Sequence, residues 1–150
     1  MTLGTQGNFF NFVLNRYPEA LALYEEDLAL IEKMGDDSQL SSILNRIATV
    51  HFAMAQGAEG EAQQEGFERA LDLSKQALKW GVDLDREGDL AFAAEAVMKF
   101  AAQLGRSEDF AQALQAASDR SIWERFGNLK MMIEKYAALS EAASQLNQSE

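Results

Sequence analysis

The sequence predicts an all-α fold, and three observations support that prediction. Apolar residues recur with a period close to 3.6 through most of the 150 residues. Segments in which apolar and polar residues alternate, as they do in half-buried strands, are absent. An aromatic residue followed three positions later by Ala-Leu occurs three times, at Tyr17–Leu21, Phe67–Leu71 and Phe110–Leu114. A motif that returns at intervals indicates similar helical units stacked on one another.

Proline and glycine mark the expected ends of the helices. Pro18 suits the first turn of a helix that should run to about Met34, where Gly35 ends it. The next helix is predicted over residues 38–56, and because it is apolar on two sides we expect it to be buried between neighbours. Polar residues and glycines make residues 56–66 a predicted loop or frayed helix start. Further helices are expected at about 64–80, 87–104, 108–117 and 121–146, with a short one before Pro18.

Composition and charge narrow the class of protein. We expect one domain over residues 1–150, with residues 1–16 as an N-terminal cap and residues 147–150 as a frayed tail. The net charge of −11 disfavours nucleic acid and anionic membrane surfaces as partners. The lack of cysteine excludes disulfides and thiolate metal sites. Without a signal-peptide pattern or an apolar run of about 20 residues, the expected location is the cytoplasm.

The repeated pentapeptides resemble the second helix of the tetratricopeptide repeat, a helix–turn–helix unit of about 34 residues. In that family an aromatic residue, Ala-Leu and a further bulky residue follow one another as Tyr17, Ala20, Leu21 and Tyr24 do here. The resemblance is degenerate, because the motifs begin at residues 17, 67 and 110, wider than the standard unit, and the proline usual between units is missing. It implies a right-handed superhelix of antiparallel helix hairpins with a closing C-terminal helix. An up-and-down helical bundle is the alternative.

The first helix of the repeat unit also has counterparts in this chain. They are Leu44, Ile47, Ala48 and His51 in one unit and Trp123, Phe126 and Gly127 in the last. Tyr136 falls where the aromatic residue of a second helix would come. Because no turn residues separate Met131 from Tyr136, we expect one long closing helix there, with a hairpin as the alternative.

The resemblance implies a binding surface as well. Members of the family usually bind an extended or helical peptide on the concave face formed by the first helices. Carried over residue by residue, this face should hold Asn45, Arg46, Thr49, Phe52, Phe92, Glu95, Lys99, Gln103, Glu124, Asn128 and Met131. Members that grip a C-terminal carboxylate use Lys, Asn and Arg here, but Glu95 beside Lys99 disfavours a simple anion site.

The function expected from these features is that of an adaptor, a protein–protein interaction module for a neutral or basic segment of a partner protein. An enzyme is not expected, since no nucleophile–base pair, metal-ligand set or phosphate loop is visible, and no cofactor is implied. The alternative is a structural subunit that self-associates into a homo-oligomer. For Phe9, Phe10 and Phe12 we favour a cap on the N-terminal end over a homodimer interface, since uncapped repeat ends expose apolar surface.

Two further patterns are interpreted as structural. His51, the only histidine, has apolar neighbours one helical turn away, which favours a packed core residue. Asp83, Asp85 and Glu87 resemble the start of a calcium loop. That loop needs a bidentate glutamate at its twelfth position, which here is Ala94. We therefore interpret the acidic residues as a turn between helices.

Overall fold

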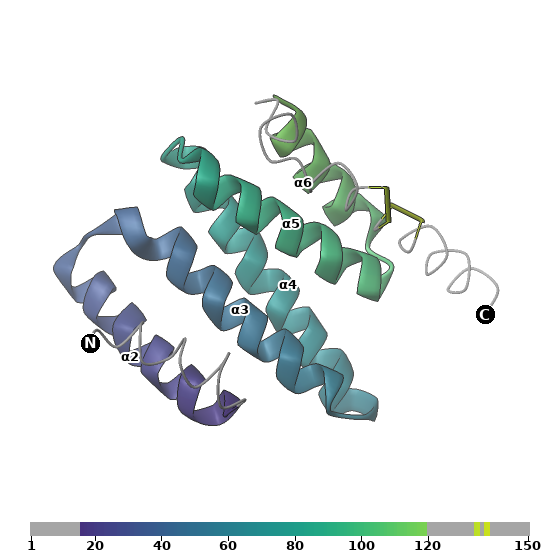
Figure 1. Ribbon diagram of the computed structural model, residues 1–150, viewed down its shortest axis with the longest axis horizontal. Helices are drawn as coiled ribbons and strands as arrows, with labels where there is room; N and C mark the ends of the chain where they lie inside the picture. Colours follow the sequence, from purple (N-terminus) through teal and green to yellow (C-terminus); the bar gives the residue numbers. More distant parts are fainter. Residues whose placement is uncertain (1–15, 120–133, 136, 139–150) are drawn as a thin grey trace.

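The computed structural model describes residues 16–119 together with 134, 135, 137 and 138. Within residues 16–119 the chain forms five α-helices and one short 3-10 helix, and no strand occurs there (Figure 1). The α-helices are α2 (Tyr17–Met34), α3 (Leu40–Gln56), α4 (Gly60–Asp83), α5 (Glu87–Leu104) and α6 (Ser107–Asp119); the 3-10 helix η1 (Asp37–Gln39) precedes α3. The all-α prediction is confirmed. The predicted cap with Phe9, Phe10 and Phe12 and most of the predicted closing helix lie outside the described residues.

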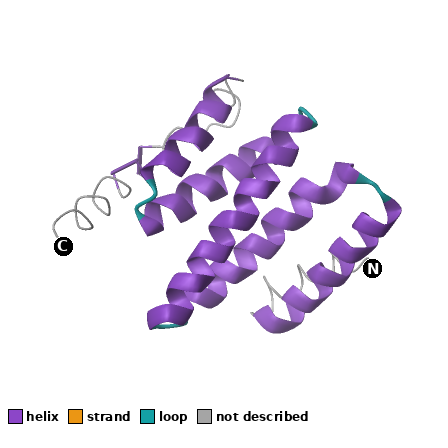
Figure 2. Ribbon diagram, turned by 180° about the vertical axis from the view of Figure 1, so that it is seen from behind, coloured by secondary structure: helices purple, strands orange, loops and turns teal. Residues whose placement is uncertain are grey.

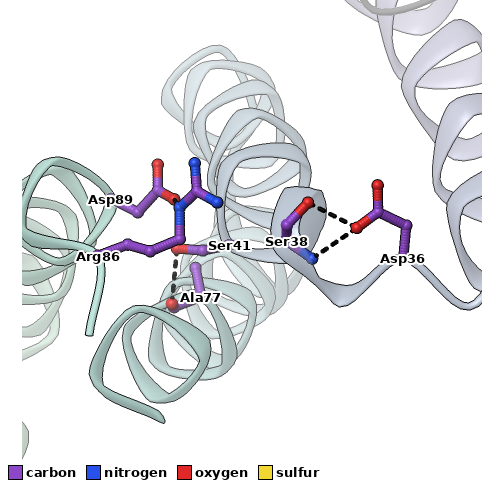
Figure 3. A network of polar contacts seen from close by, with 6 residues as sticks. All are labelled: Asp36, Ser38, Ser41, Ala77, Arg86 and Asp89. Carbon is purple, nitrogen blue, oxygen red and sulfur yellow. Dashed lines mark hydrogen bonds and ion pairs between the residues drawn. The ribbon is translucent and has the colours of Figure 1, made fainter. Parts of the chain in front are cut away.

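Local chemistry explains several helix boundaries. Pro18 lies in the first turn of α2, where its missing N–H leaves no helical hydrogen bond unmade. Gly35 ends α2 and Gly105 ends α5 in the left-handed conformation, with φ of 70° and 69°, which only glycine adopts at little cost. Asp36 caps η1, because its carboxylate accepts hydrogen bonds from the N–H and the hydroxyl of Ser38 at 3.2 and 2.6 Å (Figure 3). These boundaries agree with the prediction.

The helix predicted at about residues 64–80 is longer at both ends than expected. This helix, α4, begins at Gly60 rather than near Gln64 and ends at Asp83 rather than near Trp80. Residues 60–66 are therefore helical, which agrees with the alternative of a helix start and not with a loop. The turn between α3 and α4 is short, which is the reason that these two helices pack against each other along most of their length.

Two glycines that resemble helix breakers lie inside α4. A Cβ placed on Gly66 would stand 2.6 Å from the Cβ of Ala55 in α3. A Cβ placed on Gly81 would stand 3.0 Å from the backbone of Leu90 in α5. Glycine at these positions removes the atom that would hold the neighbouring helix away, so both residues serve close helix packing rather than chain reversal.

Each helix packs on the next one along the chain, and α3 also contacts α5 (Figures 1 and 2). The helices α3 and α5 therefore lie side by side, with α4 packed against both. The alanines of the repeated pentapeptides, Ala20, Ala70 and Ala113, are fully buried, as expected for small residues between closely packed helices. The core thus runs continuously from α2 to α6. None of the described helices has the length and apolar character needed to span a membrane.

Polar contacts add cross-links between helices. The buried hydroxyl of Ser41 in α3 donates a hydrogen bond of 2.8 Å to the carbonyl of Ala77 in α4 (Figure 3). Farther along, the Lys75 ammonium lies 2.9 Å from the Asp109 carboxylate, which joins α4 to α6. Such partly exposed ion pairs contribute at most about 1 kcal/mol each.

Candidate functional site

Six of the residues predicted to face a partner line one hollow, which we call the α3–α5 hollow. Its volume is about 150 Å³, comparable to a cavity that holds one aromatic ring. The lining residues are Asn45, Thr49 and Phe52 of α3 and Phe92, Glu95, Ala96, Lys99 and Phe100 of α5. The structure therefore brings together, from two helices about fifty residues apart, most of the site that the sequence predicted.

Helical spacing explains why these residues share one hollow. Residues 45, 49 and 52 are four and three positions apart, so they fall on one face of α3. Residues 92, 96 and 100 repeat every four positions along α5, with 95 and 99 beside them. Because α3 and α5 contact each other, these two faces form the opposite walls of the hollow.

Aromatic rings form the floor of the hollow and part of its rim. The Phe52 ring stacks on that of Phe100, with centroids 4.6 Å apart and planes at 25°, and its centroid lies 5.1 Å from that of the Phe67 ring. Phe52 is only 5% exposed, so it supports the site from below. Phe92, by contrast, is 67% exposed and is the largest apolar side chain that the hollow offers to a partner.

The two charged residues of the hollow do not pair with each other. The Lys99 ammonium lies 4.8 Å from the centroid of the Phe52 ring, in cation–π contact. In the part of the chain that the structure describes, Glu95 makes no ion pair within 4.0 Å. Burial raises the pKa of Glu95 above its ordinary value, and the charge of Lys99 only partly opposes that rise. The hollow therefore holds a half-buried carboxyl group that no cation of the described residues pairs with.

Asn45 provides a second unsatisfied group. Its side-chain oxygen Oδ1 is buried and accepts no hydrogen bond from the described residues. The nearby hydroxyl of Thr49 donates to the backbone carbonyl of Asn45 instead, at 2.9 Å. An acceptor buried without a donor costs about 1–3 kcal/mol in the folded chain. Because this oxygen is buried, a donor from a bound molecule reaches it only when the Asn45 side chain turns toward the hollow.

The remaining predicted site residues lie elsewhere. Arg46 lines a different hollow of about 270 Å³, together with Arg86 and Asp89, which form an ion pair at 3.0 Å (Figure 3). Arg46 follows Asn45 directly in α3, so its side chain points about 100° around the helix axis from that of Asn45. Gln103 is exposed on the last turn of α5, outside the lining of the α3–α5 hollow. Glu124, Asn128 and Met131 lie outside the described residues.

Sequence reasoning missed Ala96 and Phe100, which complete the lining. The signal was present, because both continue the four-residue spacing that begins at Phe92. The unpaired Oδ1 of Asn45 had no such signal, since satisfaction of a side-chain group depends on which neighbours the fold brings near it.

The other candidate group, His51, lies on α3 away from this lining and is half-buried. Burial lowers the pKa of His51, the charge of Arg69 lowers it further, and the charge of Glu25 opposes both. Among the described residues, no group of three or more acidic or histidine side chains is arranged to hold a metal ion.

Comparison with known proteins finds no counterpart. No protein-family model matches the chain, and neither a curated protein nor a solved structure matches it. The function must therefore be argued from the site itself.

Proposed function

We propose that the chain is a protein-interaction module that binds a segment of a partner protein in the α3–α5 hollow. In this proposal the helices form a tetratricopeptide-like superhelix, whose first helices α3 and α5 carry the binding face. The direct contact between α3 and α5, with α4 packed against both, supports that assignment. The proposal includes no catalytic step, cofactor or metal.

The observation that carries the proposal is the exposed Phe92 ring at the rim of a hollow that also holds unsatisfied polar groups. A large aromatic side chain left 67% exposed is typical of an anchor in a protein interface. Glu95 follows Phe92 by three residues on α5, and Asn45 lies on the opposite wall, so polar groups line the hollow with the ring. Apolar anchors with a few placed polar groups are the usual make-up of a recognition site.

The experiment is a selection of binders from a library of random twelve-residue peptides, followed by titration of the enriched peptides. Three proteins are compared: the wild-type chain, F92A and the control M34A. Met34 is 76% exposed at the end of α2 and lies outside the lining of the hollow. We expect F92A to weaken binding about tenfold or more, and M34A to leave it unchanged. Binders that tolerate F92A, or a library that yields no binder, would refute the proposal.

A second candidate function is self-association. Leu30 and Met34 are exposed by 47% and 76% one helical turn apart on α2, so they form an apolar surface patch away from the hollow. A homo-oligomer formed through this patch would sediment faster as concentration rises, and M34A would reduce that change. A strict monomer over the whole concentration range excludes this candidate.

A further inference from the structure

The Glu95 carboxyl group in the α3–α5 hollow is half-buried and makes no ion pair with the described residues. A carboxylate removed from water is costly unless it is paired and hydrogen-bonded. Lys99, four residues later on the same helix, is the natural intrahelical partner. Its ammonium group lies instead over the Phe52 ring.

We infer that the hollow selects its partner segment through an arginine side chain, whose guanidinium group stacks on the Phe92 ring and pairs with the Glu95 carboxylate. This inference rests on the proposed function, since it names the chemistry of the segment that the same hollow binds. It goes beyond the proposal by fixing one residue type in that segment.

The placement of Phe92 and Glu95 favours a guanidinium group in particular. Three residues apart on α5, they are neighbours on one helix face and both line the hollow. Arginine presents a flat cation that stacks on aromatic rings and donates two parallel hydrogen bonds to one carboxylate. Lysine is a compact, more strongly hydrated charge and makes neither contact as well. An exposed ring beside a free carboxylate therefore matches arginine better than lysine.

The opposite wall includes an amide group. Asn45 lies on α3 across the hollow from Glu95, and its buried Oδ1, which has no donor among the described residues, comes within reach of a ligand when the side chain turns. A guanidinium group carries five N–H donors, so it can serve a carboxylate and still donate to a further acceptor. The volume of about 150 Å³ accommodates one such planar group.

The net charge of the chain favours a basic segment over an acidic one. The net charge of −11 attracts basic segments and repels acidic ones over long range. Within the hollow, Glu95 and Lys99 carry opposite charges, and the contact of the Lys99 ammonium with the Phe52 ring does not cancel its charge. The long-range charge therefore favours a basic segment, and the position of Glu95 beside Phe92 decides where its cation binds.

The test extends the peptide titration. The tightest peptide from the selection is resynthesised with its arginine replaced by lysine or by citrulline, which has nearly the same shape but no charge. Each version is titrated against the wild-type chain, E95Q and the control E32Q. The control removes the same charge from an exposed position on α2, so it reports long-range attraction alone.

We expect citrulline to weaken binding to the wild-type chain about tenfold, the loss typical of one hydrogen bond to a charged group. E95Q should weaken the arginine peptide by a similar factor and leave the citrulline peptide little changed, so that the two changes are coupled. E32Q should leave the preference for arginine intact.

Two results would overturn the inference, and only one of them would also refute the proposed function. Peptides that need Phe92 but show no preference for arginine, or whose preference survives E95Q, refute the arginine site and keep the proposed interaction module. A lack of any Phe92-dependent binder refutes both.

Discussion

The close approach of α3 and α4 at Gly66 makes a sharp prediction about stability. Replacing Gly66 with alanine would place a Cβ 2.6 Å from the Cβ of Ala55, 3.4 Å from its Cα and 3.7 Å from the carbonyl oxygen of His51. The first distance is about 1 Å shorter than an ordinary contact between carbon atoms. Because a Cβ is fixed by its own backbone, no side-chain rotation relieves the clash. The two helices must move apart.

The expected magnitude follows from two opposing effects. Alanine favours a helix interior over glycine by about 1 kcal/mol. Overpacking of a tight interface costs about 1–3 kcal/mol, and a clash between rigid atoms belongs in the upper part of that range. We therefore expect G66A to lower the free energy of unfolding by about 1–2 kcal/mol. On helix propensity alone, the same change would raise it.

The assay is urea unfolding followed by far-UV circular dichroism, with the change in midpoint converted through the m value. G88A is the matched control, because a Cβ on Gly88 in the first turn of α5 meets nothing within 4 Å and so should stabilise the chain by up to about 1 kcal/mol. The double variant A55G/G66A returns the methyl group to the other helix and should recover part of the loss. A G66A chain at least as stable as G88A would falsify the close packing of α3 on α4.

Three further predictions use the same unfolding assay. S41A should lower the free energy of unfolding by about 1 kcal/mol, because it removes the buried hydrogen bond to Ala77 in the neighbouring helix. S74A removes a hydrogen bond within its own helix and should lower that free energy by less. Equal losses would contradict the role of Ser41 as a cross-link between helices. The lowered pKa of His51 means that the unfolded chain binds more protons as pH falls below the ordinary value of 6.5, so wild-type stability should drop in that range and H51Q should flatten the drop. The raised pKa of Glu95 has the opposite effect on stability, because the folded chain holds this proton more readily than the unfolded chain. E95Q should therefore be more stable than the wild type at pH 7, and the difference should vanish as pH falls through that pKa. An E95Q chain that is less stable at pH 7 would show that the carboxylate is satisfied in the folded state.

The helices were predictable where local chemistry fixes their ends. Proline at the start of α2 and left-handed glycines after α2 and α5 fix where these helices begin or end. The helix α4 was predicted, but both of its ends were placed too far inside, because Gly66 and Gly81 act through their neighbours Ala55 and Leu90. In the sequence, a glycine that allows close helix packing looks the same as a glycine that forms a turn. Only the tertiary contacts distinguish the two.

Part of the grouping of the candidate site residues followed from the sequence. The family resemblance grouped residues of α3 and α5, and six of them line one hollow. Arg46 was grouped with them through the family resemblance, but its direction around α3 puts it in the other hollow. The position of Lys99 over the Phe52 ring depends on the distance between two helices, which no single-helix pattern contains.

The packing of each described helix on its neighbour in the chain also has a kinetic consequence. Contacts form between segments that are close in sequence, and even the contact of α3 with α5 spans only one intervening helix. Little loop entropy is lost before such contacts form, and chains with this topology typically fold within microseconds to milliseconds. The most extensive interface, between α3 and α4, needs neither α5 nor α6. During synthesis the α3–α4 hairpin can therefore assemble first, and each later helix can add to a surface that already exists.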